Sequence, residues 1–418
     1  MKRNMFKRIK QLQLIFLCLC LAILFGATFE NYKQAQIERI NEISSNSYVN
    51  NENVSPKDLF LESWLLVKQS YAEPHLNDQN WYRWKRRYVN KIKDNDDAYV
   101  AINTMLASLD DPYSRLLSKE EFEDQTNSIE SKMYGIGVNI ASVAGKIYIV
   151  NVIKGSPADS SGLKQGDMLV SVDNHQIKGK SIFQVAQYIK GALNETVTLV
   201  ILRDGANLTK KIKRAQIKVR TVECQKLDKN TGYIHILSFI GNETPVEFIN
   251  ALNKVKDTKG LILDLRGNTG GLFQNAVFVA NIFLKNGDIV SVIGRDGQSS
   301  SYSVKDNEFV YDKPLVVLVD GDSASASEIV SGALKDNNRA KIVGTKTFGK
   351  GVVQKIYALP NKMGMNLTIA KYLTPSGRDI NEKGIEPDYE VTFTRDDVNK
   401  NFDRQLEFAK NLIAKQIK

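Results

Sequence analysis

The sequence contains little cysteine and little histidine, with three residues of each among 418. Cys18 and Cys20 lie within an apolar stretch near the N-terminus, and Cys224 stands alone. This pattern excludes a disulfide framework and lacks the spacing of a metal site. A lone Cys224 is more typical of a small packed residue than of a nucleophile. We therefore expect a protein without a metal ion or a cofactor.

Because histidine is scarce, a Ser–His–Asp triad has few candidates for its base. His75 lies in the polar segment EPHLND and His175 in the turn-like segment VDNHQ, whereas His235 alternates with isoleucines in an expected strand. Each position is more typical of a surface or sheet residue than of a general base. Lysine is therefore the simplest candidate for a base that activates a serine in this chain.

The net charge of +10 does not by itself indicate nucleic-acid binding. Part of the charge comes from the first thirty residues, which hold five bases and a single acid. The remaining charge is spread along the chain, without a basic stripe interleaved with aromatic residues. We therefore do not expect nucleic acid as a partner.

Residues 1–30 begin with these bases and continue with an apolar run from Leu14 to Phe25. The run has the length of a signal-peptide core, and its extension to Phe29 approaches a short membrane span. Phe25 and Ala27 form a poor cleavage pair, so an uncleaved signal anchor with its basic end in the cytoplasm is predicted. A cleaved signal is the alternative. Either segment places the body of the protein outside the cytoplasm, and the anchor makes the membrane a partner.

The region 31–122 is expected to form a polar stalk followed by helices. Apolar residues recur at helical spacing in 59–71 and in 97–109. Between them, the aromatic and basic segment 81–87 is interpreted as packed tryptophans whose basic neighbours stay in water.

A glycine-rich loop marks the next region, 123–215. Gly135, Ile136, Gly137 and Val138 precede an expected strand. The exposed N–H groups of such a loop can hold a terminal carboxylate while a peptide adds to the sheet edge. Glycine pairs usually mark only turns, so the loop by itself does not fix this role.

The segment 319–354 carries the residues best suited to nucleophilic chemistry. The apolar run 314–319 predicts a buried strand, and 328–335 predicts a helix. At such a joint, unpaired N–H groups and the helix dipole can stabilise an oxyanion. Three serines stand there, Ser323, Ser325 and Ser327. Ser325 and Glu328 also fit a capping box, so a purely structural serine is the alternative. The residues alone do not choose among the three.

Lys350 lies downstream in a glycine-flanked turn that leads into an alternating strand, 352–357. In a partly apolar pocket its pKa would fall from ~10.4, so that the neutral amine can act as a base. Gln354 lies four residues on and would share a strand face with Lys350. There it can accept a hydrogen bond from the lysine and fix its direction.

Two other functional motifs are approached in this segment but are excluded. Gly344 and Gly349-Lys350 approach a phosphate-binding loop, but Gly351 replaces the Ser or Thr that binds magnesium, and a strand follows in place of a helix. A G-x-S-x-G nucleophile elbow on Ser323 is excluded because a serine occupies its last glycine position.

A second glycine turn follows the apolar run 261–266. Gly267–Gly271 can point backbone N–H groups toward the serine joint, although a tight turn that needs positive φ explains the same glycines. Asp264 and Arg266 are expected to order this turn rather than take part in the chemistry.

These segments resemble the C-terminal processing peptidases, or tail-specific proteases. The likeness rests on DSASASEIVSGALKD followed by GTKTFGKGVVQ, and on the DLRxNxGG pattern of the glycine turn. It implies a Ser–Lys dyad with Ser325 as nucleophile, Lys350 as general base and Gln354 as orienting residue. It also implies an oxyanion hole made by the N–H of Ala326 and that of a glycine, Gly270 or Gly271.

The segment GIGV followed by GSPADSSGLKQGD resembles PDZ domains, which implies that Gly135, Ile136, Gly137 and Val138 bind the C-terminus of a substrate. We therefore expect a multi-domain α/β protein. A mixed α/β catalytic core of the crotonase-like or tail-specific protease type would span 216–418 and end in a C-terminal helix. A PDZ-like, β-rich domain at 123–215 and an N-terminal helical segment would precede it.

The expected activity is endoproteolysis near the C-termini of extracytoplasmic proteins, and protein substrates with a free C-terminus are the expected partners. A catalytically inert PDZ scaffold is one alternative. An esterase or amidase with the same dyad is another. Homo-oligomerisation is left open.

Overall fold

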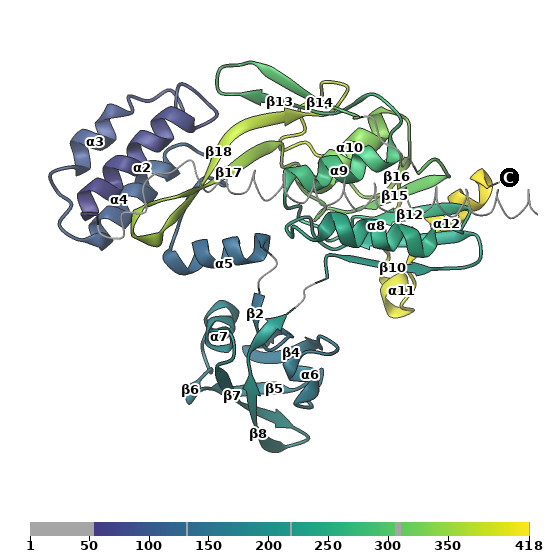
Figure 1. Ribbon diagram of the computed structural model, residues 1–418, viewed down its shortest axis with the longest axis horizontal. Coiled ribbons are helices and arrows are strands. Elements are labelled where there is room, and N and C mark those ends of the chain that lie inside the picture. The colour runs from purple at the N-terminus through teal and green to yellow at the C-terminus, as the bar shows by residue number, and fades with distance from the viewer. Residues whose placement is uncertain (1–53, 131–132, 218–219, 306–310, 418) are drawn as a thin grey trace, which may run out of the picture. The chain divides into compact units, whose positions relative to one another are not determined.

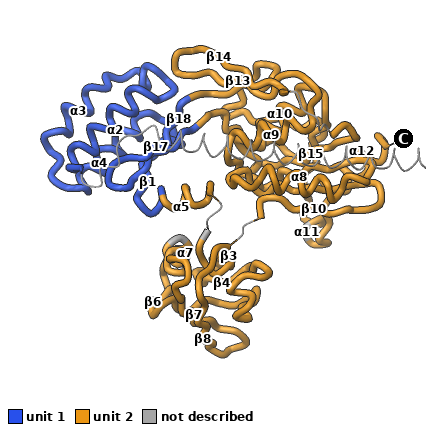
Figure 2. The backbone as a smooth tube through the Cα atoms, viewed as in Figure 1, with its two compact units in different colours: residues 1–122, 354–369 blue, residues 123–353, 370–418 orange. Residues whose placement is uncertain are grey.

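The computed structural model describes residues 54–130, 133–217, 220–305 and 311–417. The predicted anchor at 1–30 lies outside these ranges. Within them, no helix combines the length and the apolar character that a membrane span requires. The described chain forms two compact units, which Figure 2 shows in different colours. Unit 1 holds the described residues up to Phe122 together with Gln354–Ile369, and unit 2 holds Glu123–Val353 and Ala370–Lys418.

The described part of unit 1 includes the α-helices α2 (Pro56–Ser70), α3 (Tyr82–Tyr88) and α4 (Asn95–Ala107) (Figure 1). Helices α2 and α4 begin at Ser55 and Asp94, whose side chains accept the N–H of the residue three positions on. The apolar faces of these two helices pack in one core, as the spacing of their apolar residues predicts.

The aromatic and basic segment of unit 1 packs as expected. Trp64 and Trp81 each donate their indole N–H to the carbonyl oxygen of the other, at 3.0 and 3.1 Å. Trp84 is buried as well, whereas the basic side chains of α3 are exposed. The tryptophans are therefore part of the helical core.

Strand β18 (Gly364–Leu373) takes part in both units. In unit 1 its first residues pair antiparallel with β1 (Arg115–Leu117), and β17 (Val352–Ala358) also pairs with it. In unit 2 its last residues pair with β13 (Asp288–Gly294), which forms a hairpin with β14 (Ser299–Ser303).

Unit 2 begins with most of α5 (Lys119–Ile129) and a β-rich module at the position expected for a PDZ domain. The module holds an antiparallel sheet of six strands, β3 (Val138–Val143), β4 (Lys146–Val152), β5 (Met168–Val172), β6 (His175–Gln176), β7 (Thr196–Arg203) and β8 (Ala206–Lys213). Two short strands flank it, β2 (Met133–Gly135) and β9 (Ala215–Ile217), and its helices are α6 (Pro157–Ser160) and α7 (Ile182–Ile189).

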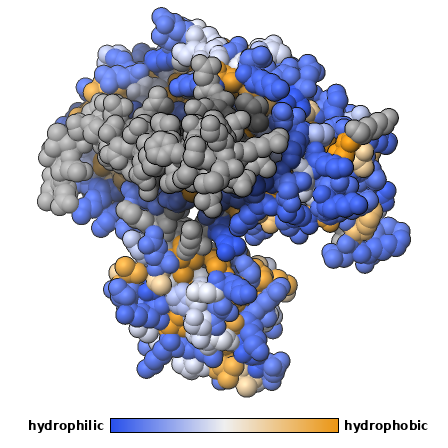
Figure 3. Space-filling view, turned by 45° about the vertical axis from the view of Figure 1, so that its right-hand side comes forward, coloured by the Kyte–Doolittle hydropathy of each residue, from blue (hydrophilic) through white to orange (hydrophobic). Residues whose placement is uncertain are grey.

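The strand order β3-β4-β5-β7-β8 leaves β3 at an edge of this sheet. Buried side chains such as Ile149, Val185 and Val197 fill the core of the module. Apolar residues also reach its surface, as the orange areas in Figure 3 show. The exposed large ones are Val143, Val150, Ile182 and Leu193.

The rest of unit 2 is built on a second six-stranded sheet. Its strands, in spatial order, are β10 (Val222–Lys226), β11 (Thr231–Ile236), β12 (Gly260–Asp264), β15 (Leu315–Val319), β16 (Lys341–Gly344) and β19 (Tyr389–Glu390). All neighbours are parallel except β10 and β11. Its helices are α8 (Thr244–Val255), α9 (Phe273–Phe283), α10 (Ala326–Asp336), α11 (Arg395–Asn399) and α12 (Arg404–Gln416).

Both faces of this sheet are covered, because alternate residues of the central strands point to opposite sides. On β12, Leu261 and Leu263 pack with α8, α9 and α10, whereas Ile262 packs with Ala409 and Ile413 of α12. Strand β15 alternates in the same way. The predicted α/β class is confirmed, and the carboxyl ends of β12 and β15 lie side by side, where open parallel sheets place their sites.

Candidate active site

Ser325 stands between β15 and the first residue of α10, with a backbone that non-glycine residues rarely adopt. Its φ is +53° and its ψ is −109°. Such a conformation costs on the order of 1–3 kcal/mol and persists only where the surroundings impose it. A strained turn from strand to helix is typical of exposed serine nucleophiles. The turn has this strain although its sequence lacks the glycines of the elbow motif.

The two flanking serines, Ser323 and Ser327, have structural roles. Ser323 donates its hydroxyl to the carbonyl oxygen of Leu265 at 2.9 Å, and Ser327 donates to that of Asn268 at 2.8 Å. Both are completely buried, whereas Ser325 is partly exposed. The structure therefore distinguishes the three hydroxyls that the sequence analysis could not separate.

The side chain of Glu328 joins the serine turn to the lysine turn. Its two carboxylate oxygens accept the N–H of Ser325 at 2.8 Å and that of Lys350 at 2.9 Å. They also accept the N–H of Gly349 at 2.7 Å and the hydroxyl of Thr347 at 2.6 Å. Glu328 is completely buried, so these four donors replace the water that a carboxylate otherwise needs. The sequence pattern indicated only a capping role for Glu328.

Tyr372 makes a second link between the same two residues. Its hydroxyl lies 2.5 Å from the carbonyl oxygen of Lys350 and 3.2 Å from that of Ser325. The single hydroxyl proton serves mainly the nearer oxygen. The amide of Tyr372 donates to the carbonyl oxygen of Gly351. No local motif in the sequence marks Tyr372 as part of the site.

Gln354 lies in β17, four residues after Lys350, as predicted. Its side-chain amide donates to the carbonyl oxygen of Tyr113 at 2.5 Å, within unit 1. The hydrogen bond predicted between Gln354 and Lys350 stays a prediction.

The glycine turn lies against Ser325, and Gly270 makes the closest approach. A Cβ built on Gly270 would lie 2.9 Å from Cβ of Ser325 and 3.1 Å from the nitrogen of Ala326. The φ of Gly270 is +102°. Glycine is therefore required here both by space and by conformation.

The neighbouring N–H groups differ in what they bind. The N–H of Gly270 donates to Oδ1 of its own turn residue Asn268, at 2.9 Å. Across the described chain, the N–H groups of Gly271 and Ala326 have no hydrogen-bond acceptor. Gly271 is exposed, has a φ of +146°, and has no room for a Cβ because the backbone of Phe239 and Ile240 fills that space.

Asn268 holds the glycine turn to the serine turn. Its carbonyl oxygen accepts the N–H of Ala324 at 3.0 Å and the hydroxyl of Ser327 at 2.8 Å. Its side chain donates to the carbonyl oxygen of Ile236 at 2.7 Å and is completely buried. Asp320 adds a second connection by accepting the N–H of Gly267 at 3.0 Å. The two turns are therefore fixed to each other by several bonds.

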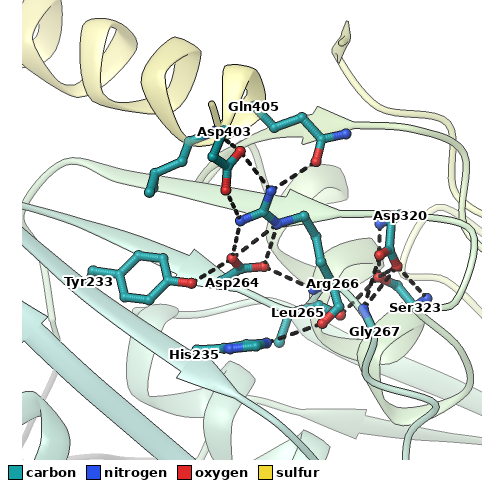
Figure 4. A network of polar contacts seen from close by, with 11 residues as sticks. Tyr233, His235, Asp264, Leu265, Arg266, Gly267, Asp320, Ser323, Asp403 and Gln405 are labelled. Carbon is teal, nitrogen blue, oxygen red and sulfur yellow. Dashed lines mark hydrogen bonds and ion pairs between the residues drawn. The ribbon is translucent and has the colours of Figure 1, made fainter. Parts of the chain in front are cut away.

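Asp264 and Arg266 lie at the start of the glycine turn, in a polar network that Figure 4 shows. They contact Tyr233, Asp403 and Gln405 and order the turn, as expected.

The loop of the β-rich module has an arrangement suited to a carboxylate. The carbonyl oxygens of Ile136 and Gly137 accept the N–H groups of Ala158 and Ile153, at 2.8 and 2.9 Å. Because a trans peptide points its N–H opposite to its carbonyl, the N–H groups of Gly137 and Val138 point away from those contacts. Strand β3 follows directly and lies at an edge of the sheet, without a second partner strand among the described residues.

Comparisons with known proteins agree with this arrangement. Residues 230–391 match the peptidase family S41, and residues 135–213 match the PDZ domain. The carboxyl-terminal-processing protease of Synechocystis sp. is 37% identical over 341 residues, which cover 79% of each chain. That of Picosynechococcus sp. is 36% identical over 342 residues, covering 79% of this chain and 82% of the relative.

Among solved structures, the photosystem II D1 C-terminal processing protease aligns with a TM-score of 0.56 at 31% identity. The alignment covers 81% of this chain and 94% of that one. The β-rich module is therefore a PDZ domain, and the chain belongs to the carboxyl-terminal-processing proteases, serine-type peptidases of family S41.

Proposed function

We propose that this protease cleaves extracytoplasmic proteins near their C-termini, with Ser325 as the nucleophile and Lys350 as the general base. The observation that carries this proposal is the bonding of Glu328, whose buried carboxylate accepts the N–H groups of both residues. A carboxylate with this bonding fixes the distance between the two backbones. Such fixed geometry is what a nucleophile and its base require.

The reaction follows from these roles. The neutral amine of Lys350 takes the hydroxyl proton of Ser325 as the serine oxygen attacks the scissile carbonyl carbon. The resulting ammonium group gives that proton to the leaving amine when the peptide bond breaks. Lys350 then takes a proton from the water that attacks the acyl-enzyme, and gives it to the oxygen of Ser325 as the trimmed protein is released.

The N–H groups of Gly271 and Ala326 form the oxyanion hole in this proposal. Gly270 is the less suitable donor because its N–H is bonded to Asn268. Gly271 is exposed, and its N–H has no acceptor in the described chain. We assign to Gly270 the role of allowing the close approach between the two turns.

Gln354 orients Lys350 in this proposal, and Glu328 and Tyr372 position the two turns. Tyr372 supports this by donating its hydroxyl to the carbonyl oxygen of Lys350, at 3.2 Å from that of Ser325, while Glu328 accepts the N–H groups of both residues.

The PDZ domain would deliver the substrate. A C-terminal peptide would add to the free edge of β3, with its carboxylate at the loop of Gly135, Ile136, Gly137 and Val138. We place this domain at 123–215 and the catalytic core at 216–418. The apolar run at 14–25 favours an anchor and an extracytoplasmic location.

The test uses an unstructured protein substrate with a free apolar C-terminus. Ser325→Ala and Lys350→Ala are each expected to lower kcat by about 10³-fold or more while tail binding stays intact. Lys346→Ala is the matched control, since Lys346 is an exposed lysine of the same loop that pairs with Glu386. Cleavage that survives Ser325→Ala would show that the nucleophile is a different residue. A wild-type protein that binds tails but cuts none would favour the scaffold.

A further inference from the structure

The guanidinium of Arg266 has all its donors occupied, and residues at the start of the C-terminal helix supply three of the acceptor contacts (Figure 4). Nε donates to Asp264 at 2.9 Å, and Nη2 donates to Asp264 at 2.5 Å and to Asp403 at 2.9 Å. Nη1 donates to Asp403 and to Gln405, each at 3.0 Å. These contacts use the five N–H bonds that an arginine carries.

The network is buried around Arg266 and Asp264, whereas the side chain of Asp403 is 36% exposed, and its members are held in place by further bonds. The side chain of Arg266 is 14% exposed and that of Asp264 is 1% exposed. Tyr233 donates its hydroxyl to Asp264 at 2.7 Å, and Gln405 donates its amide to the carbonyl oxygen of Val391 at 2.7 Å. Burial alone would lower the pKa of Arg266, but the hydrogen bonds and charges of Asp264 and Asp403 raise it, so the group stays charged.

The backbone of Arg266 is fixed at the same time. Its N–H donates to Asp264 at 2.9 Å, and its carbonyl oxygen lies 3.1 Å from Nε2 of His235, which must carry the proton in this contact. From Arg266 the chain runs through Gly267 and Asn268, each with its own bonds, to Gly271. The turn that ends at Gly271 therefore begins at a residue whose side chain and backbone are both fixed.

Helix α12 is held by apolar contacts as well as by polar ones, among which Asp403 also caps the helix by accepting the N–H of Leu406 at 2.9 Å. Ala409 and Ile413 are completely buried against β12, β15 and β16. A change that removes only the bonds to Arg266 therefore leaves the helix packed, and it separates the positioning of the turn from the stability of the fold.

We propose that Asp403 and Gln405 are positioning residues of the reaction, which act through Arg266 to aim the N–H of Gly271 at the oxyanion. This inference rests on the proposed function, because it assumes that Gly271 is a donor. It makes the C-terminal helix part of the catalytic apparatus, through the contacts of its first residues with Arg266.

The experiment compares kcat, KM, tail binding and thermal unfolding for three variants of the full chain. Asp403→Asn removes the charge and one of two acceptor oxygens. Gln405→Met removes one acceptor of Arg266 and the donor to Val391, without a change of charge. Asp397→Asn is the matched control. Asp397 forms an equally close bidentate pair with Arg404 at the same helix but does not contact Arg266.

We expect kcat to fall about 10-fold for Asp403→Asn and about 3-fold for Gln405→Met, with KM and tail binding unchanged. Asp397→Asn should keep the wild-type kcat even where it lowers the unfolding temperature. A fourth variant, Arg266→Lys, should lower kcat at least as much as Asp403→Asn, because an ammonium group has three N–H donors and lacks the planar arrangement of the five that the guanidinium uses.

Two results would overturn the inference. One is a wild-type kcat in the Asp403 and Gln405 variants at temperatures where they are folded. The other is an equal loss of kcat in Asp397→Asn. If Asp403→Asn fails to fold, Gln405→Met alone decides between these outcomes. Ser325→Ala is measured beside these variants and tests the proposed function separately. Cleavage that remains in Ser325→Ala would contradict the assignment of the nucleophile, and it would not bear on the role of the helix.

Discussion

Gly270 and Ser325 lie so close that a single added carbon atom would separate them. A Cβ on Gly270 would lie 2.9 Å from Cβ of Ser325 and 2.8 Å from the carbonyl oxygen of Ala324. The two turns of the site are therefore packed so closely that no methyl group can be added between them. This fit gives a direct test of whether their spacing sets the activity.

Gly270→Ala should lower kcat about 100-fold or more, because the methyl group pushes the glycine turn away from Ser325 and displaces the oxyanion donors. Steady-state kinetics on a peptide substrate measure the loss. Gly267→Ala is the control. Gly267 also has a positive φ, of +67°, but nothing lies within 4 Å of its added Cβ. It should destabilise the fold by about 1 kcal/mol through its φ alone and leave kcat nearly unchanged.

Glu328→Gln should both destabilise the protein and lower kcat. An amide offers one acceptor oxygen to four donors, and its NH₂ group faces N–H groups that also need acceptors. Each buried donor left without a partner costs about 1–3 kcal/mol. Urea unfolding and kcat give the two readouts. Glu386→Gln, at an exposed glutamate, should change neither. A Glu328→Gln variant with wild-type kcat would contradict the positioning role.

Tyr372→Phe should lower kcat about 10-fold with a stability loss of about 1 kcal/mol, since it removes the hydrogen bond that the hydroxyl donates to the carbonyl oxygen of Lys350, close to that of Ser325. Tyr311→Phe is a contrasting control. The hydroxyl of Tyr311 is buried without a partner in the described chain, so its removal should leave kcat unchanged and raise stability. Denaturant midpoints and kcat, measured on both variants, check this pair.

The acid sensitivity of the fold should depend on Asp336. Burial alone would raise the pKa of its carboxyl, but hydrogen bonds from Thr374 and Ser376 and the charge of Arg378 lower it. A carboxyl whose folded-state pKa lies below its unfolded value of about 3.9 stabilises the protein above that value. This stability is lost as the pH falls through the lower folded-state pKa.

Asp336→Asn should therefore be less stable than the wild type near pH 6, and the difference should shrink as the pH falls below about 4. Urea midpoints measured from pH 6 to pH 3 provide the comparison. A difference that stays constant over this range would show that the carboxylate form is not the one that stabilises the fold.

The strands and helices that build the site could be predicted because their signals are local. The run 314–319 corresponds to β15, and the helical spacing after Ser325 corresponds to α10. Apolar runs of this kind need no distant partner to be recognised. The glycine turn after β12 was placed correctly for the same reason.

The distinction among the serines could not be predicted, because it depends on remote contacts. Ser323 and Ser327 bond to residues 58 and 59 positions away. The other donors to Glu328 lie 19 to 22 positions on, beyond the reach of a capping pattern. Arg266 and Asp403 are 137 positions apart. Such pairs form because β11, β12 and β15 are neighbours in one sheet and α12 packs against that sheet. No short motif encodes this arrangement.

The strained backbone of Ser325 has a consequence for whether this residue is retained during evolution. Glycine adopts a φ of +53° without strain. Ser325→Gly should therefore yield an inactive protein that unfolds at a higher denaturant concentration than the wild type. Catalysis and robustness are thus opposed at a single position. Once selection for cleavage is relaxed, thermodynamics would favour loss of the nucleophile, and a lineage that keeps Ser325 must be one that still uses it.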